Sequence, residues 1–325
     1  GSAALDIYWK SSLNIVHMCV SDFEGGASKA TVRIHQKMCS VGLNSTLLVL
    51  RKKTSIESVK VVEQPWWLTI HPKLASFLDS LLVRLFFSKK VGKTWGSGLV
   101  GAFNPKKNKY VKAADVIILY WVDSGFLSNT QLASIMALNK KIIWRLSDMW
   151  AFTGGCHYSE GCQKFMLQCG NCEQIGSTID KDVSYWSLKK KRNWTTDNLQ
   201  IVCPSKWIMD LSKSSSVLAQ ATHHHIATGV DLAVYKPCEL PTIANLVGLG
   251  NEKFTILFGA VNSLSDERKG AKELKDAIKV FSSSIENKSE YRIVVFGGSG
   301  VFQELWNGIE VNHIGVINSE EHAAN

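Results

Sequence analysis

The sequence has 325 residues, 45% hydrophobic and 20% charged, a balance typical of globular proteins and long enough for two domains. Its net charge of +9 and pI near 9.1 indicate an acidic partner, such as a nucleoside diphosphate or an anionic membrane surface. A nucleic-acid partner is disfavoured because the lysines are scattered rather than interleaved with exposed aromatic residues. No signal-peptide pattern opens the sequence, so we expect a cytoplasmic protein whose eight cysteines are reduced.

Strands and helices alternate along the chain. Apolar strands are predicted at residues 14–20, 47–50, 116–121, 141–146 and 198–203, with helices from about residue 30, over 127–138 and over 180–194. The short connections fit parallel crossovers, which predicts an α/β, doubly wound sheet. After a connector at 229–237 the pattern restarts, with strands at 254–258, 291–296 and 312–316 and a helix at 269–281. We therefore expect two domains, residues 1–230 and 231–325, of which the second has too few strands to be a complete doubly wound domain.

Gly25 and Gly26 lie in the turn between the first strand and the first helix. Paired glycines let a ligand approach the backbone, and the N–H groups at a helix start favour an anion. Glycines also serve as plain turn residues, so the two interpretations stay open.

Residues 70–90 predict a helix with a broad apolar face, preceded by Trp66 and Trp67. The segment is too short to span a bilayer and is interrupted by Asp79 and Arg84. It reads as a core helix or, alternatively, as a helix lying in a membrane interface. The basic run 189–192 is interpreted as a solvated helix face, with contact to anionic lipid as the alternative.

A polar, cysteine-rich loop follows the strand at 141–146, where a doubly wound sheet has its ligand crevice. Its cysteines are Cys156, Cys162, Cys169 and Cys172, separated by five, six and two residues. Four thiolates suit a structural zinc ion, whereas unbound or disulfide-linked structural cysteines and redox chemistry are the alternatives. His157 stands beside them and is interpreted either as a residue that binds substrate or catalyses, or as a hydrogen-bonded structural histidine.

Arg268 and Lys269 precede the helix of the second domain. Cations at a helix start oppose its dipole unless an anion binds between them, so this pair predicts a diphosphate site. Gly297 and Gly298 form a second glycine turn after the strand at 291–296.

Several segments together resemble a known family, the retaining glycosyltransferases of family 4, in the branch that builds bacterial exopolysaccharides of the colanic-acid kind. These segments are GGASKATVRIHQKMCSVG, YWVDSGFLS, WRLSDMWAFTGGCHYSEGCQKFMLQCGNC, IVCPSKWIMDLSKSS, ATGVDLAVYKP, ILFGAVNSLSDERKGAKEL, IVVFGGSG and HIGVINSEEHAAN. The resemblance implies the GT-B fold, in which two Rossmann-like domains bind the acceptor and the donor, respectively.

By this resemblance, the residues that contact the donor diphosphate or lie beside it are Arg268, Lys269, Gly25, Gly26, Gly297 and Gly298. Asp148 matches the aspartate of the family's His-Asp pair, but Ser147 replaces the histidine. The resemblance implies a nucleotide-diphosphate sugar donor, a glycan or lipid-linked acceptor and transfer with retention of configuration. It requires no metal for the chemistry, so any zinc would be structural. Trp66, Trp67 and the helix after them suggest peripheral contact of this cytoplasmic protein with the inner face of the plasma membrane.

Family members continue into an acidic Glu-x7-Glu segment that holds the donor sugar, whereas this sequence stops at Asn325. We therefore expect the chain alone to be a poor enzyme. A non-catalytic glycan- or nucleotide-binding module is the alternative. A nicotinamide-dependent oxidoreductase is disfavoured because no G-x-G-x-x-G follows the first strand.

Overall fold

The structure is a computed structural model that describes residues 13–63, 74–86, 95–194, 196–236, 252–259, 266–298 and 300–317. The chain divides into two compact units, Gly1–Gly229 and Val230–Asn325. The expected membrane-facing Trp66 and Trp67 lie outside the described residues. Within the described residues, no helix combines the length and the apolar character that crossing a bilayer requires.

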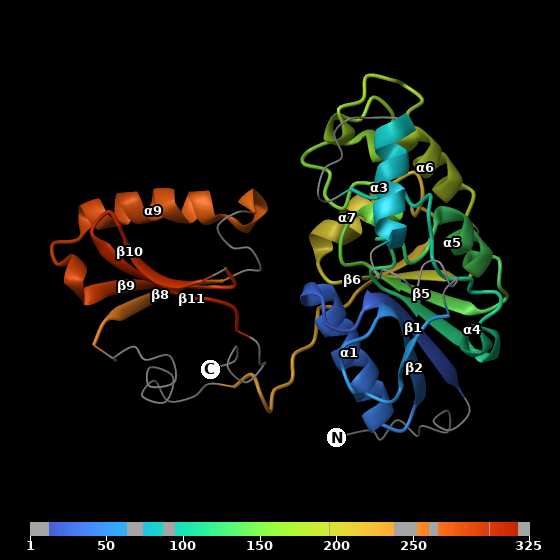
Figure 1. Ribbon diagram of the computed structural model, residues 1–325, viewed down its shortest axis with the longest axis horizontal. Helices are drawn as coiled ribbons and strands as arrows, with labels where there is room; N and C mark the ends of the chain where they lie inside the picture. The colour runs from blue at the N-terminus through green and yellow to red at the C-terminus, as the bar shows by residue number, and fades with distance from the viewer. Residues whose placement is uncertain are drawn as a thin grey trace. The chain divides into compact units, whose positions relative to one another are not determined.

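A seven-stranded parallel sheet forms the centre of the first unit (Figure 1), in the order β3-β2-β1-β4-β5-β6-β7. Its strands are β1 (Asn14–Ser21), β2 (Asn44–Arg51), β3 (Val59–Val61), β4 (Val116–Leu119), β5 (Lys141–Arg145), β6 (Leu199–Cys203) and β7 (Thr222–His225). Because all seven strands run the same way, the loops that follow β1, β4 and β5 meet at one edge of the sheet.

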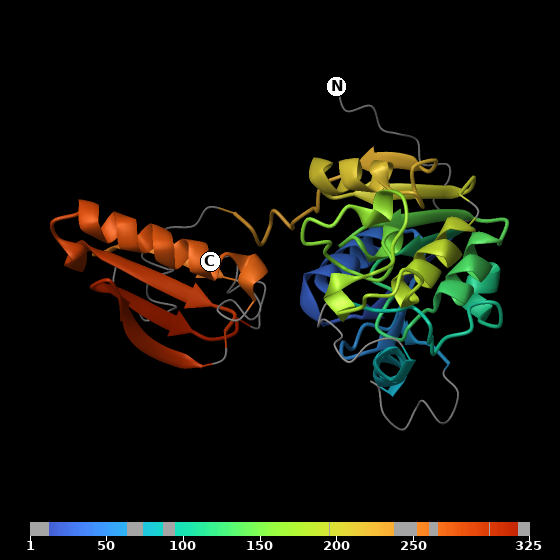
Figure 2. The ribbon, with the colours of Figure 1, turned by 90° about the horizontal axis from the view of Figure 1, so that it is seen from above.

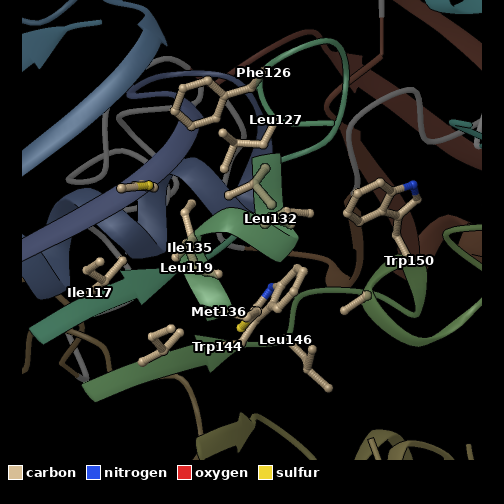
Figure 3. Packing of buried hydrophobic residues seen from close by; sticks show 14 of the residues in the cluster. Ile117, Leu119, Phe126, Leu127, Leu132, Ile135, Met136, Trp144, Leu146 and Trp150 are labelled. Atoms are coloured by element: carbon tan, nitrogen blue, oxygen red, sulfur yellow. The ribbon is translucent and has the colours of Figure 1, made fainter. Parts of the chain in front are cut away.

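Helices cover both faces of this sheet. They are α1 (Gly25–Ser40), α3 (Leu74–Phe86), α4 (Lys109–Ala113), α5 (Asn129–Met136), α6 (Val183–Arg192) and α7 (Lys206–Ser214). Val32, Ile34 and Met38 of α1 pack against one face. On the opposite face, α5 places Leu132, Ile135 and Met136 beside strands β4 and β5 (Figure 3). The central strands β4 and β5 are nearly continuous apolar runs because both of their faces are buried.

The second unit contains a four-stranded sheet in the order β10-β11-β9-β8. Its elements are β8 (Phe254–Gly259), the 3₁₀ turn η4 (Glu267–Lys269), α9 (Ala271–Ser284), η5 (Lys288–Glu290), β9 (Tyr291–Phe296), β10 (Val301–Trp306) and β11 (Ile309–Ile314). The helix α9 runs along one face of this sheet (Figure 2), where Ile278 is buried against Ile293 and Val311. The predicted α/β alternation is therefore present in both units.

Several predicted boundaries in the second unit were wrong. Strand β10 was not predicted, and the strand expected at 312–316 is β11, which begins at Ile309. The two strands form an antiparallel hairpin closed by Asn307 and Gly308, whose φ angles are 50° and 86°. Asn-Gly is the dipeptide that such a tight turn prefers, so the sequence does contain a signal for this hairpin. The helix expected from residue 269 begins at Ala271.

Candidate functional site

Two aspartates and a histidine meet at the carboxyl edge of the first sheet. Asp123 lies in the loop after β4, and Asp148 lies in the loop after β5. His157, in the cysteine-rich loop, lies between them. Its Nδ1 is 2.7 Å from Oδ2 of Asp148, and its Nε2 is 3.0 Å from Oδ2 of Asp123. The structure thus brings together both predicted catalytic residues and adds Asp123, which the sequence alone did not identify.

The geometry makes His157 a buried cation. Ionised carboxylates only accept hydrogen bonds, so both ring nitrogens of His157 must carry protons to donate to Asp148 and Asp123. Burial acts to lower the pKa of His157, but the charge of Asp148 and the hydrogen bonds to both carboxylates outweigh it and raise this pKa to about 10. At neutral pH the group is an imidazolium held between two carboxylates.

Trp150 and Gly96 form the wall around this group. Oδ1 of Asp148 accepts a hydrogen bond from the backbone N–H of Trp150 at 2.9 Å, and the Trp150 ring stacks on His157. The indole N–H of Trp150 donates to the carbonyl of Gly96 at 2.9 Å. A Cβ atom on Gly96 would lie 1.9 Å from Oδ2 of Asp123, so only glycine allows the chain to approach this carboxylate so closely.

Lys191 is fully buried beneath this wall, which corrects the prediction that the whole basic run 189–192 is a solvated face. Its ammonium donates to the carbonyl oxygens of Trp150 and Thr153 and lies 3.7 Å from the centre of the Trp150 ring. Burial lowers the pKa of Lys191 to about 8. The helical period of α6 turns this one lysine inward, a feature that a run of four cations conceals in the sequence.

Asp79 of α3 is a further buried carboxylate of this region. It accepts hydrogen bonds from the backbone N–H and hydroxyl of Ser97 and from the N–H groups of Leu99 and Val100. Burial, followed by the charge of Asp123, raises the pKa of Asp79. The same helix buries Ala75 and Val83, which fits the core-helix interpretation of this segment.

The residues of the site differ in how far their side chains are exposed to solvent. The side chain of His157 is 8% exposed and both of its nitrogens are engaged, so it is arranged to position other groups. The side chain of Asp148 is 15% exposed. Ser147, where the resembled family has a histidine, keeps a buried hydroxyl with no hydrogen-bond partner among the described residues, and it lines a cavity of about 10 Å³ with Trp121. Catalytic roles for Asp148 and His157 stay predictions.

The predicted metal-binding cysteines surround one cavity. Cys156, Cys162, Cys169 and Cys172 all line a hollow of about 500 Å³ within the loop. None is in a disulfide, and burial raises the pKa of Cys156 to about 11 and that of Cys169 to about 12. In the described part of the chain, no three Cys, His, Asp or Glu side chains lie close enough together to hold a metal ion. The four cysteines therefore line one cavity, but their side chains are too far apart to bind a single metal ion.

Gly25 and Gly26 begin α1 at the carboxyl end of β1. Gly25 has a φ of 74°, and a Cβ on either glycine would meet nothing within 4 Å, so the backbone is open to a ligand. The N-cap residue, Glu24, gives no side-chain hydrogen bond to the helix, because its carboxylate pairs with Arg51 at 2.5 Å. This glycine turn therefore has the features that the anion-site prediction requires on its protein side.

Arg268 and Lys269 form the end of η4, just before α9. The guanidinium of Arg268 is already bound by Asp266, with Nε at 3.0 Å from Oδ1 and Nη2 at 2.7 Å from Oδ2. Lys269 is exposed. Gly297 and Gly298 follow β9, and the N–H of Gly297 donates to the carbonyl of Gly315 at 2.7 Å. A diphosphate ligand at Arg268 would have to share or displace Asp266.

This chain is similar to known proteins in sequence and in fold. No family model matches it. A curated relative from Escherichia coli (strain K12), named "Putative colanic acid biosynthesis glycosyl transferase WcaC", is 24% identical over 238 residues, covering 68% of this chain. The match covers 55% of the relative, so the chain spans about half of the relative's length. A crystal structure of Alr3699/HepE from Anabaena, in complex with UDP and glucose, superposes with a TM-score of 0.51 at 12% identity, covering 96% of this chain and 72% of that one. The expected α/β, GT-B-type fold is thereby confirmed.

Proposed function

We propose that the protein is a glycosyltransferase that moves a sugar from a nucleotide-diphosphate donor to a glycan or lipid-linked acceptor in exopolysaccharide biosynthesis. The observation that carries this proposal is the sequence relationship to the WcaC protein, which spans 238 residues. The fold shared with a protein that binds UDP and glucose supports a nucleotide-sugar donor. We place the reaction in the cytoplasm, at the inner face of the membrane, where a lipid-linked acceptor would be presented.

The donor diphosphate is assigned to Arg268 and Lys269. The fork of the guanidinium fits two phosphate oxygens, and the ammonium adds a second positive charge close by. One further negative charge develops on the leaving diphosphate as the bond to the sugar breaks, and these cations stabilise it. The cation pair supplies the charge neutralisation for which other enzymes use a metal ion, so the chemistry needs no cofactor.

The acceptor is assigned to the first unit, with Asp148 in contact with it. His157 and Asp123 are positioning residues: the hydrogen bond from His157 fixes the orientation of Asp148. A carboxylate held this way accepts a hydrogen bond from a hydroxyl group of the acceptor and orients the oxygen of that hydroxyl for attack.

We assign the reaction to transfer with retention of configuration. The acceptor oxygen bonds to the anomeric carbon on the face from which the diphosphate leaves. The bonding electron pair goes to the diphosphate, and the hydroxyl proton passes to a diphosphate oxygen. His157 already holds two protons and therefore serves as a positioning cation rather than as a base.

A non-catalytic glycan- or nucleotide-binding module is the second candidate. The observation that favours it is that the charged groups of both regions are already engaged within the protein: His157 by two carboxylates and Arg268 by Asp266. Such a module would bind a sugar or nucleotide without breaking the bond between them.

Nucleoside diphosphate binding tests the donor assignment. We expect calorimetric titration with UDP and GDP to show binding of one of them to the unmodified protein. Arg268→Ala should weaken that binding at least tenfold, because a charge-assisted bidentate contact is worth about 1.5–3 kcal/mol. Lys279→Ala, which removes an exposed cation from the third turn of α9, the helix that follows Arg268, is the matched control. This variant should bind like the unmodified protein. Equal weakening by both substitutions, or no binding of either nucleotide, would contradict the assignment.

A further inference from the structure

We propose that Cys156, Cys162, Cys169 and Cys172 bind one structural zinc ion, which fixes the loop that carries His157. The first observation is their common location. All four lie within a 17-residue stretch and line the same cavity of about 500 Å³. Of the seven described cysteines, the other three lie in β1, α1 and β6, outside this loop.

The second observation is that the backbone at two of these cysteines is already held in place. The N–H of Cys172 donates to Oδ2 of Asp182 at 3.0 Å, and the carbonyl of Cys156 accepts a hydrogen bond from the Thr153 hydroxyl at 2.6 Å. Such outer contacts orient and support metal-bound ligands.

The third observation is a compensating charge. Four thiolates and one Zn²⁺ carry a net charge of about −2, which a buried loop must balance. The ammonium of Lys191 is fully buried and donates to the carbonyl oxygen of Thr153, three residues before Cys156. This lysine therefore lies where an anionic metal–thiolate group would require a cation.

Zinc binding requires a rearrangement confined to the loop. Zn–S bonds of about 2.3 Å bring four tetrahedral sulfur atoms to within about 4 Å of one another, closer than the described side chains now lie. All four cysteines line the same hollow. Drawing them inward would fill this hollow.

The consequence for the site follows from the sequence neighbours of the cysteines. Cys156 is adjacent to His157, and it forms an isolated antiparallel bridge with Trp95. The carbonyl of His157 accepts a hydrogen bond from the N–H of Met149 at 2.9 Å. A metal ion at Cys156 would therefore fix the backbone that holds the imidazole between Asp123 and Asp148.

Metal content tests this proposal. The protein, purified under reducing conditions and incubated with Zn²⁺ before desalting, should contain about one zinc per chain by plasma mass spectrometry. Cys162→Ser removes an exposed thiol without disturbing the core and should lower zinc retention at least tenfold. Cys39→Ser, in α1, is the matched control and should retain the metal. Replacing zinc with Co²⁺ should give the intense absorption of cobalt–thiolate bonds.

Thiol labelling keeps the test valid where a variant fails to fold. In the unmodified protein, the four loop cysteines should resist alkylation until a chelator is added, whereas the buried Cys19 and Cys203 should resist it both before and after. Absence of metal after incubation with Zn²⁺, with all loop thiols freely alkylated, would overturn the proposal. A disulfide between loop cysteines in the reduced, zinc-incubated protein would overturn it as well.

Discussion

His17 gives the first unit a specific sensitivity to acid. It is buried in β1, where Nδ1 lies 3.0 Å from the hydroxyl of Tyr120. Burial, followed by the charge of His35, lowers the pKa of His17 to about 3. The folded protein therefore keeps His17 neutral, whereas the unfolded chain takes up a proton below about pH 6.5. This group stabilises the fold above pH 6.5 and loses that contribution as the pH falls.

We predict that His17→Leu makes the free energy of unfolding less dependent on pH below pH 6.5. One excess proton in the unfolded state costs about 1.4 kcal/mol per pH unit. Between pH 6.5 and 4.5, the free energy of unfolding of the unmodified protein should thus fall by roughly 2 kcal/mol more than that of the variant. Urea unfolding at pH 6.5, 5.5 and 4.5 measures this difference. A constant offset between the two proteins at all three values would show that His17 does not carry the effect.

Gly96 controls the approach of the chain to Asp123. We predict that Gly96→Ala forces the carboxylate away from His157, because the added Cβ would lie 1.9 Å from its oxygen. Overpacking of this kind costs about 1–3 kcal/mol. Thermal unfolding should show a lower midpoint, whereas Gly229→Ala, whose Cβ would meet nothing within 4 Å, should leave it unchanged. Equal midpoints for the two variants would mean that Asp123 moves aside freely.

The residues of the site were only partly predictable. Asp148 and His157 stand in a segment whose glycines and cysteines mark it as unusual, so pattern and resemblance found them. Asp79 and Lys191 are more than 100 residues apart in the sequence, and nothing local distinguishes them from surface charges. Their burial follows from how α3 and α6 pack, which is tertiary information.

Strands β1 and β5 and helix α5 were well predicted because each is a regular apolar pattern, whereas α1 begins at Gly25, ahead of the predicted start near residue 30. The strands expected at 14–20, 141–146 and 198–203 match β1, β5 and β6 within a residue or two. Strand β7 was missed because its sequence, Thr222–His225, is polar and exposed, and only pairing with β6 makes it a strand. Edge strands carry little hydrophobic signal, so their prediction depends on knowing the neighbouring strand.

The start of α5 offers a direct test of local stability. Ser128 and Gln131 form a reciprocal capping box: the Ser128 hydroxyl accepts from the N–H of Gln131, and the Gln131 side chain accepts from the N–H of Ser128. We predict that Ser128→Ala lowers the free energy of unfolding by about 1 kcal/mol. Ser134→Ala, inside the same helix, should change it by only a few tenths, because alanine has the higher helix propensity. Chemical denaturation followed by circular dichroism compares the two. Equal losses would indicate that the cap contributes nothing beyond general packing.

The whole chain combines two units with separate roles in the proposed reaction. The first holds the carboxylate–imidazolium–carboxylate group at the edge of its sheet, and the second carries the cation pair for the diphosphate. The net charge of +9 favours encounter with an anionic donor, and this attraction weakens as salt is added. Sugar transfer needs both units, because neither the donor cations nor the acceptor carboxylate can complete it alone.

The most direct measurement is sugar transfer itself. The protein is incubated with UDP- and GDP-sugars and a panel of glycan and lipid-linked acceptors, and the products are followed by NMR. Our account predicts slow nucleoside diphosphate release matched by a new glycosidic bond, with the anomeric configuration of the donor retained and with a further loss of rate in Asp148→Asn. Binding of the nucleotide sugar without release of diphosphate for any acceptor would contradict it and identify a binding module instead.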